Sequence, residues 1–380
     1  MTENMTEILM REGHQAGIDL IGVTDAEDIE CVPWTYPEKE EHYFPCRASW
    51  IKENTYSPKK IMAEAKAVIV TAMYMYGYDK IKESIKGFLR ANIGPWTRGY
   101  VEARDYAAGW ITKFIEAQGY AAVVSNEIPY RTLAVKAGLG KIGRNGFLYH
   151  DAMGSYLNLC CILTDAPLKC VNYGTVSPEN NCGNCKKCSA MCPTGALRRD
   201  GSYHAELCLH LWQQGKGMYG EEIPREERHK CLNYLMRTGR CLEVCPRNYK
   251  LKPRESFPFE SEEKEDSPLL EHLILASDKE YRERLPYHVY KYGIKAIRRD
   301  IIIAAGNSKD EILVDKLGEG LLELDEKCRG LCAWALGEIG GNKAEKWLAM
   351  AYEKEEQKSV RQEIEYARRK TIAGKEDGYI

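Results

Sequence analysis

Apolar and polar positions follow two different periods in the first part of the chain. Apolar residues spaced three and four apart predict helices over residues 6–16 and 101–119. In the second helix they place Tyr106, Trp110, Phe114 and Ile115 on one face. Apolar runs rich in β-branched residues predict four strands, at 18–24, 67–74, 120–124 and 157–163. The run at 67–74 is apolar at nearly every position, so we expect a strand buried on both faces.

The pattern changes twice further along the chain. Residues from about 167 to 252 are punctuated by Gly and Pro and poor in strand patterns, which is typical of a segment that folds around metal clusters. An acidic, proline-containing stretch at 255–268 is expected to be a solvated linker. Helical periodicity then continues to the end. We therefore predict an α+β multidomain chain: an α/β or α+β domain at 1–170, a cysteine module at 171–254, the linker, and helices at 269–380.

Two segments of the helical tail resemble each other. Residues 297–307 and 328–337 have Gly306 and Gly337 at matching positions, which predicts HEAT-like helical repeats. Cys328 and Cys332 lie four residues apart, the spacing of a metal half-site on a helix. They alternate with apolar residues, which favours burial in a core instead.

Composition and charge narrow the class of protein. The chain has 380 residues, with 54 Lys and Arg against 56 Asp and Glu, a net charge of −2. Such a balance gives no global attraction to nucleic acid, so any binding of RNA needs a local basic patch. No apolar run has the roughly eighteen residues of a membrane span, and the first residues are polar. We expect a cytoplasmic protein without a membrane partner, in which cysteines stay reduced.

Eight of the fifteen cysteines lie between positions 182 and 245. The first four, followed by Pro193, have the C-x2-C-x2-C-x3-C-P spacing of bacterial ferredoxins, in which the fourth cysteine binds the other cluster. Cys241 to Pro246 supplies the end of a second such motif. The spacing therefore predicts two 4Fe–4S clusters.

Crossed ligation assigns the cysteines to two sets. The first cluster takes Cys182, Cys185, Cys188 and Cys245. The second motif is incomplete, because Thr238 stands where a cysteine is usual. We therefore assign to the second cluster the remaining cysteines of the module, Cys192, Cys208, Cys231 and Cys241. The alternative is that Cys208 or Cys231 is a buried thiol and this cluster is incomplete. Nearby cations can compensate the thiolate charge, namely Lys186, Lys187, Arg198 and Arg240.

A glycine-rich stretch carries a resemblance to a known family. Ala137-Gly-Leu-Gly-Lys-Ile-Gly-Arg-Asn145, followed by Gly154-Ser155 and the Ile-Leu-Thr-Asp of 162–165, resembles the signature of the epoxyqueuosine reductase family. The Arg-Asp-Tyr at 104–106 resembles another segment of that family, and the modules come in the same order. The resemblance implies a cobalamin-binding domain over residues 1–170, related in fold to reductive dehalogenases. It also implies reduction of epoxyqueuosine to queuosine in tRNA, electrons from a flavodoxin- or ferredoxin-type donor, and a tail that helps to hold the tRNA. We expect a monomer.

The same resemblance points to cofactor-binding residues. Gly138, Gly140 and Gly143 would allow close backbone approach to the cobalamin, and Arg144, Asn145 and Ser155 would donate and accept hydrogen bonds. The other predicted cofactor contacts are Asn126, Arg131 and Ala137. The alternative is a glycine-rich turn without a ligand.

One departure from the family leaves the substrate open. The family carries an aspartate, its proposed proton donor, shortly before the glycine motif. Asn126, or without a gap Val124, stands in its place here. We predict that Glu127 or Tyr130 delivers the proton, although Glu127 could equally be a solvated loop residue. The alternatives are a cobalamin-dependent reductase of another small substrate, an activator of a corrinoid protein, and a two-cluster electron-transfer protein without cobalamin.

A basic, aromatic stretch lies at 281–300 in the tail. Phosphates and bases of RNA could contact its side chains, or the stretch could be an ordinary helix surface. The residues concerned are Arg282, Arg284, Lys291, Lys295, Arg298, Arg299, Tyr287, Tyr290 and Tyr292.

Overall fold

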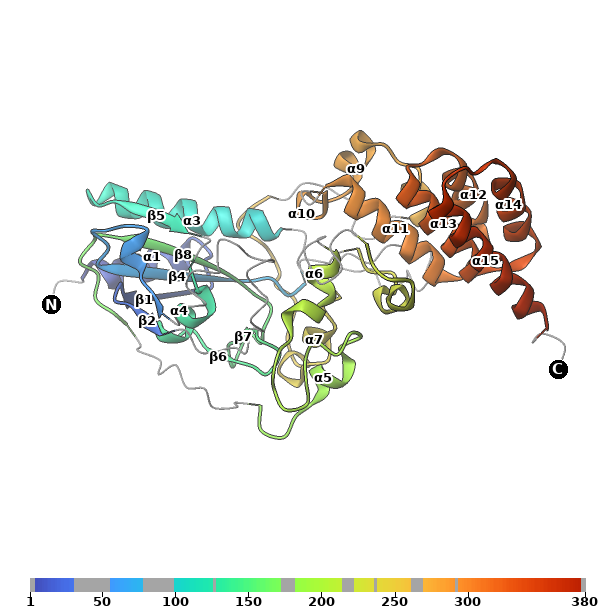
Figure 1. Ribbon diagram of the computed structural model, residues 1–380. Helices are drawn as coiled ribbons and strands as arrows, with labels where there is room; N and C mark the ends of the chain where they lie inside the picture. The colour runs from blue at the N-terminus through green and yellow to red at the C-terminus, as the bar shows by residue number, and fades with distance from the viewer. Residues whose placement is uncertain are drawn as a thin grey trace. The chain divides into compact units, whose positions relative to one another are not determined.

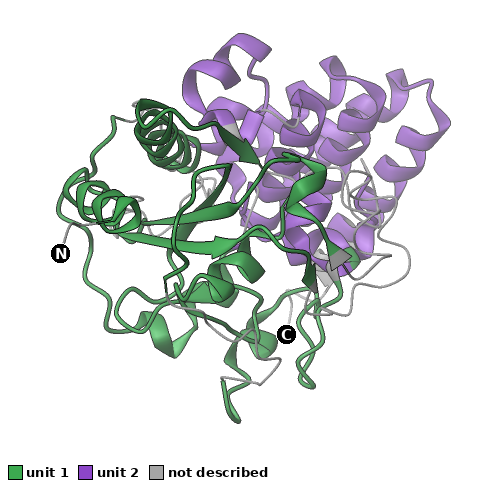
Figure 2. Cartoon of the chain, turned by 90° about the vertical axis from the view of Figure 1, so that its left-hand side faces the viewer, with its two compact units in different colours: residues 1–79, 98–206, 239–262 green, residues 80–97, 207–238, 263–380 purple. Residues whose placement is uncertain are grey.

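The computed structural model divides the chain into two compact units, each with its own core (Figure 2). Unit 1 comprises residues 1–79, 98–206 and 239–262, and unit 2 comprises residues 80–97, 207–238 and 263–380. The domain boundaries drawn from the sequence stay predictions. The structure describes residues 4–30, 55–77, 99–125, 128–171, 182–213, 222–235, 238–260, 269–290 and 293–376.

Unit 1 is built on a four-stranded sheet. The strand order is β1 (Leu20–Asp25), β4 (Ala67–Tyr74), β8 (Leu157–Thr164) and β5 (Ala122–Ser125), and every neighbouring pair is antiparallel. The four predicted strands are thus confirmed, and the antiparallel pairing selects α+β over α/β for this domain. The central strand β4 is buried from Ala67 to Met73, as its continuous apolar run predicts.

Helices cover both faces of this sheet (Figure 1). On one face lie α1 (Met5–Gln15), which begins at a capping box of Asn4 and Glu7, and α3 (Tyr100–Ala117). On the other face, α4 (Tyr130–Lys136) packs against alternate residues of β4. The predicted helices are confirmed, and Trp110 and Phe114 of the predicted aromatic face of α3 stack with ring centres 5.6 Å apart. The buried positions of α3 are mostly alanines and isoleucines, because the helix packs closely on the sheet, whereas three of the four predicted residues are only half-buried: Tyr106, Trp110 and Phe114.

Short elements complete unit 1. Two small ribbons are formed by β2 (Ile29–Glu30) with β3 (Thr55–Tyr56) and by β6 (Lys141–Ile142) with β7 (Leu148–Tyr149). A 3₁₀ turn, η2, spans Pro58–Lys60. The cysteine segments contribute α5 (Lys187–Met191), α7 (Arg240–Glu243) and η5 (Pro246–Asn248), and α5 packs against α7.

Unit 2 is helical in its described residues. The 3₁₀ turn η3 (Ala205–Leu207) crosses from unit 1 into unit 2. The remaining elements are α6 (Leu209–Gln213), η4 (Arg225–Cys231), α8 (Leu270–Leu273), α9 (Asp278–Arg284), α10 (Tyr287–Tyr290), α11 (Ile294–Ser308), η6 (Glu311–Leu313), α12 (Val314–Glu323), α13 (Glu326–Ile339), α14 (Gly341–Lys354) and α15 (Lys358–Glu376).

The matching glycines of the tail lie where every second helix packs together, α11 on α13 and α13 on α15. The helix α13 packs against both α11 and α15. A Cβ at Gly306 of α11 would lie 2.6 Å from the ring of Trp334, and one at Gly337 of α13 would lie 2.8 Å from Cα of Ala367. Glycine therefore permits each close approach.

Cys328 and Cys332 are buried in this core, which favours the core interpretation over a metal half-site. Burial raises the pKa of Cys328 to about 12.

A buried ion pair lies in the same core. The Arg299 side chain is 3% exposed and donates to the Asp300 carboxylate at 2.8 Å. It also donates to the carbonyl oxygens of Trp212 and Gln213, each at 3.0 Å. Arg299 thus joins α11 to the end of α6.

None of the described helices is long and apolar enough to cross a membrane.

Candidate iron–sulfur site

Four cysteines of unit 1 line one cavity of about 280 Å³. They are the set assigned to the first cluster, Cys182, Cys185, Cys188 and Cys245. Cys182 and Cys185 lie in one turn, in which the Cys185 N–H donates to the Cys182 carbonyl oxygen at 3.1 Å. Cys188 lies on α5, and Cys245 is the N-cap residue of η5. The structure thus brings together residues 63 positions apart, as the difference between 245 and 182 shows.

The environment of these thiols disfavours their ionisation in the absence of a cation. Burial raises the pKa of Cys188 and of Cys245, and the neighbouring Cys182 and Cys185 raise both further. A bound cluster would reverse this balance, because iron stabilises thiolates. Four thiols around one cavity are the donor set that a 4Fe–4S cluster requires.

The described cysteines of the cavity do not form a site for a single metal ion. Among the residues that the structure describes, no three His, Cys, Asp or Glu side chains come close enough to hold one metal ion. Each thiolate of a 4Fe–4S cluster binds a different iron atom, so its ligands lie farther apart than those of a single ion.

The tip of the β6–β7 hairpin holds the first cysteine loop. The backbone N–H of Arg144 donates to Sγ of Cys182 at 3.2 Å. Its guanidinium donates to the carbonyl oxygens of Gly183 and Arg199, each at 3.1 Å. The Asn145 side chain donates to the carbonyl oxygen of Cys241 at 2.9 Å. Two residues predicted to contact cobalamin are therefore bound to the cysteine segments.

Ser155 has a similar place. It is buried, and its backbone N–H donates to Oδ1 of Asn248 at 2.9 Å. The Asn248 amide in turn donates to the carbonyl oxygen of Leu242, at 2.8 Å. This chain of bonds ties the loop before β8 to the segments around Cys245.

The glycines of the motif serve close backbone packing. A Cβ at Gly140, whose φ is +159°, would overlap the carbonyl oxygen of Tyr149 across the hairpin. Gly138 follows the end of α4 with φ +77°. Ala137 is buried, and its carbonyl oxygen lies 2.6 Å from where a Cβ at Gly22 would be, so this stretch lies against β1. Gly143 lines the cavity itself.

In the structure, residues of the glycine motif contribute to the four-cysteine cavity. Gly143, Arg144, Asn145 and Ser155 line the four-cysteine cavity, so the described residues do not show them around a separate cobalamin pocket. Their assignment to cobalamin stays a prediction. Arg131 lies on α4 with its guanidinium 5.2 Å from the ring centre of Phe147 and 5.6 Å from that of Tyr130. Asn126 and Glu127 lie outside the described residues.

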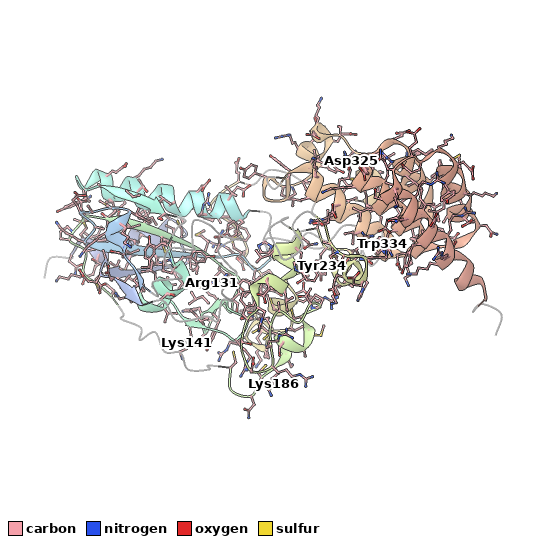
Figure 3. The ribbon with its side chains drawn as sticks, viewed as in Figure 1. Arg131, Lys141, Lys186, Tyr234, Asp325 and Trp334 are labelled. Carbon is pink, nitrogen blue, oxygen red and sulfur yellow. The ribbon has the colours of Figure 1, made fainter. Side chains whose placement is uncertain are left out.

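Cations line the cavity, and Lys187 is the one among them that the sequence analysis named as a compensating charge. Lys187 donates to the Tyr249 hydroxyl at 3.1 Å and lies 4.9 Å from its ring centre. Arg247 lies 3.8 Å from the ring centre of Tyr149. Lys186, labelled in Figure 3, is the N-cap residue of α5. Sequence reasoning missed Arg247 and both tyrosines, although Arg247-Asn248 directly after Cys-Pro was an available signal.

The second set of cysteines is divided between the units. Cys192, the C-cap residue of α5, and Cys241 on α7 belong to unit 1, whereas Cys208 and Cys231 belong to unit 2. Cys231 is 2% exposed in the helical core, and burial raises its pKa well above the ordinary value. Ligation of the second cluster stays a prediction.

The basic stretch of the tail is partly structural. Arg298 donates to the carbonyl oxygen of Ala276 at 2.6 Å, and Arg299 is buried in its ion pair, so the expectation that Arg299 contacts RNA is wrong. Arg282 lies 5.6 Å from the ring centre of Tyr290, and Tyr287 is exposed. Lys291 and Tyr292 lie outside the described residues.

A four-cysteine cavity with ferredoxin spacing, attached to an α+β domain, defines the chain as an iron–sulfur protein with an additional domain. The family described as 4Fe–4S double cluster binding domain matches residues 181–248. The chain as a whole belongs to the epoxyqueuosine reductase family.

Similar proteins support this membership over nearly the whole length. The epoxyqueuosine reductase of Bacillus subtilis (strain 168) is 28% identical over 379 residues, which are 95% of this chain and 94% of that protein. An uncharacterized protein of Geobacillus stearothermophilus is 33% identical over 219 residues, 56% of this chain and 95% of that protein. A crystal structure of epoxyqueuosine reductase with an epoxyqueuosine-modified tRNA stem loop matches with a TM-score of 0.78 at 25% identity. It covers 97% of this chain and 99% of that one.

Proposed function

We propose that this chain is an iron–sulfur-dependent epoxyqueuosine reductase, which reduces epoxyqueuosine to queuosine in tRNA. The observation that carries the proposal is the convergence of Cys182, Cys185, Cys188 and Cys245 on one cavity. It occurs in a chain that is similar to epoxyqueuosine reductases over nearly its whole length. The enzyme would be an oxidoreductase of the cytoplasm, where tRNA is modified, and would act as a monomer.

Two clusters suit the chemistry of this reaction. Removal of an epoxide oxygen as water takes two electrons and two protons, and a 4Fe–4S cluster passes electrons singly. The first cluster would be held by the four cysteines of the cavity. The second would be held by the set predicted from spacing, Cys192, Cys208, Cys231 and Cys241. An external donor of the flavodoxin or ferredoxin type would supply the electrons.

Cobalamin is the second proposed cofactor, and the resemblance to the family supports it. When bound, cobalamin would supply a metal centre that can reduce a carbon atom of the substrate. Neither the side chains nor the clusters supply such a centre. Since the residues first assigned to it contact the cysteine segments, we derive no step from them. Tyr130, on the first turn of α4, could hold a proton at its hydroxyl beside the Arg131 cation, and Glu127 is the alternative donor.

Unit 2 is proposed to consist of HEAT-like repeats that help to hold tRNA. The packing of α13 on α11 and α15 and the matching glycines Gly306 and Gly337 support this proposal. The side chains of 281–300 that are not used in the core remain candidates for phosphates and bases, chiefly Arg282, Arg284 and Tyr287.

Conversion of the modified nucleoside tests the function. Purified protein loaded with both cofactors is reduced and mixed with tRNA from a queuosine-deficient strain that accumulates epoxyqueuosine, and nucleosides are measured by mass spectrometry. We expect queuosine to form with the wild type and not with Cys188→Ala, which lacks one ligand of the first cluster. A fully loaded, reduced wild type that leaves the epoxide unchanged would contradict the assignment.

A second candidate function is supported by one substitution in the sequence. Asn126 stands where the family has its aspartate, so the enzyme could reduce another small substrate or activate a corrinoid protein. Such an enzyme would retain cobalamin and clusters but show no affinity for tRNA. Binding of tRNA, measured in the same preparation, distinguishes the two.

A further inference from the structure

We propose that Arg144 is a positioning residue that raises the reduction potential of the first cluster. The inference rests on the proposed function only in that a 4Fe–4S cluster is bound by the four cysteines of the cavity. It concerns how readily that cluster accepts an electron, and it assigns to the tip of the β6–β7 hairpin a role in electron transfer.

Three hydrogen bonds fix Arg144 against the cysteine loop. Its backbone N–H donates to Sγ of Cys182. One guanidinium nitrogen donates to the carbonyl oxygen of Gly183, which directly follows that cysteine, and another donates to that of Arg199. The cation is therefore held at the cavity by two separate stretches of backbone, and it cannot turn towards solvent without losing both bonds.

One N–H donor of the Arg144 side chain has no hydrogen-bond partner. Nε of Arg144 is buried and has no hydrogen-bond partner, although the residue lines the cavity of the four thiols. A buried N–H without an acceptor is unfavourable, so such a group normally has a partner in the functional state. Sulfur atoms of a bound cluster would supply acceptors at this place.

The other two cations at the cavity are held differently. Lys187 and Arg247 lie over the rings of Tyr249 and Tyr149, where the aromatic faces attract the positive charge. Only Arg144, among the described residues that line the cavity, combines a backbone bond to a cysteine sulfur with a buried, unpaired side-chain donor.

The expected effect has a definite sign. Reduction adds one negative charge to the cluster, and hydrogen bonds to its sulfur atoms together with a nearby positive charge stabilise the more negative state. Arginine remains protonated at every accessible pH, so its charge does not vary with conditions. Removal of the guanidinium should therefore make the first cluster harder to reduce.

A redox titration of Arg144→Gln followed by electron paramagnetic resonance tests the proposal. At a fixed potential we expect the ratio of reduced to oxidised first cluster to fall about tenfold, equivalent to a midpoint roughly 59 mV lower for a one-electron couple. The matched control is Lys141→Gln, which removes one positive charge from an exposed position on the same hairpin, outside the cavity lining. Its midpoint should remain that of the wild type.

Measuring the iron content of each variant distinguishes a failure of the proposed function from a failure of the role assigned to Arg144. A wild type without cluster signals would defeat the proposed function itself. An Arg144→Gln protein with full iron and an unchanged midpoint, or an equal shift in Lys141→Gln, would overturn the role of Arg144 alone. If Arg144→Gln loses its iron, Arg144→Lys carries the test, because lysine keeps the charge but has no Nε–H at that place. A smaller shift in the same direction is then expected, and no shift would overturn the proposal.

Discussion

Replacement of Arg299 by methionine should strongly destabilise the helical unit. The side chain is 3% exposed, and it makes three sets of bonds: to the Asp300 carboxylate and to the carbonyl oxygens of Trp212 and Gln213. Methionine can fill part of the space but donates no hydrogen bond. Arg299→Met would leave a buried carboxylate without its cation and two buried carbonyl groups without this donor.

The size of the effect follows from the loss of one partner of a buried pair. Breaking such a pair destabilises proteins by about 3–5 kcal/mol, because the remaining charge is uncompensated. Replacing both partners by apolar residues is often close to neutral. The double variant Arg299→Met/Asp300→Leu should therefore recover most of the free energy of unfolding lost in the single variant. The exposed pair of Arg369 and Glu365 offers a control, since the Arg369 side chain is 82% exposed and Arg369→Met should change little.

Urea denaturation followed by circular dichroism measures these differences, and pH provides an independent check. Burial raises the pKa of Asp300 from 3.8 to about 7, against the opposing effect of Arg299. The folded state thus binds this proton more tightly than the unfolded state, so Asp300 makes the free energy of unfolding fall as pH rises between these two values. Without Arg299 the pKa rises further, so the loss in Arg299→Met should be smaller at pH 5 than at pH 8. A loss below about 1 kcal/mol, independent of pH, would refute this reasoning.

Two further predictions concern packing and the first cluster. Gly306→Ala should destabilise unit 2 by about 1–3 kcal/mol despite the better helix propensity of alanine, because the new Cβ would lie 2.6 Å from the Trp334 ring. Gly109→Ala on α3, where a Cβ meets nothing within 4 Å, should instead stabilise by up to about 1 kcal/mol; equal effects in urea denaturation would show that packing is not the cause. Cys188→Ala should lose about four iron atoms per chain by chemical assay, whereas Cys328→Ala, in the helical core, should keep them all; iron retained in Cys188→Ala would remove this residue from the ligand set.

Local patterns predicted the parts of this molecule that depend on near neighbours. The strand at 67–74 could be predicted because its apolar run is continuous. The four cysteines of the cavity could be grouped from the sequence because ferredoxin spacing pairs the first three cysteines of one motif with the last cysteine of the other. Both signals are contained in the residues themselves.

Features that depend on distant partners could not be predicted in this way. Arg144 binds backbone groups 39 and 55 residues away, and Asn145 binds one 96 residues away, so their use in holding the cysteine segments left no local trace. The burial of Arg299 was hidden for the same reason, because its partners Trp212 and Gln213 precede it by more than 80 residues. On α3 the residues buried against the sheet are alanines and isoleucines, and of the face named from the sequence only Ile115 is among them.

The central claim is that the cysteines between 182 and 245 hold two clusters from which electrons reach the substrate. Anaerobic purification with added cobalamin, followed by an iron count and an absorption spectrum of the desalted protein, tests it most directly. We predict about eight iron atoms per chain together with retained corrinoid absorbance. Eight iron atoms without corrinoid absorbance would leave a two-cluster electron-transfer protein, and about four or fewer would contradict the two-cluster assignment itself.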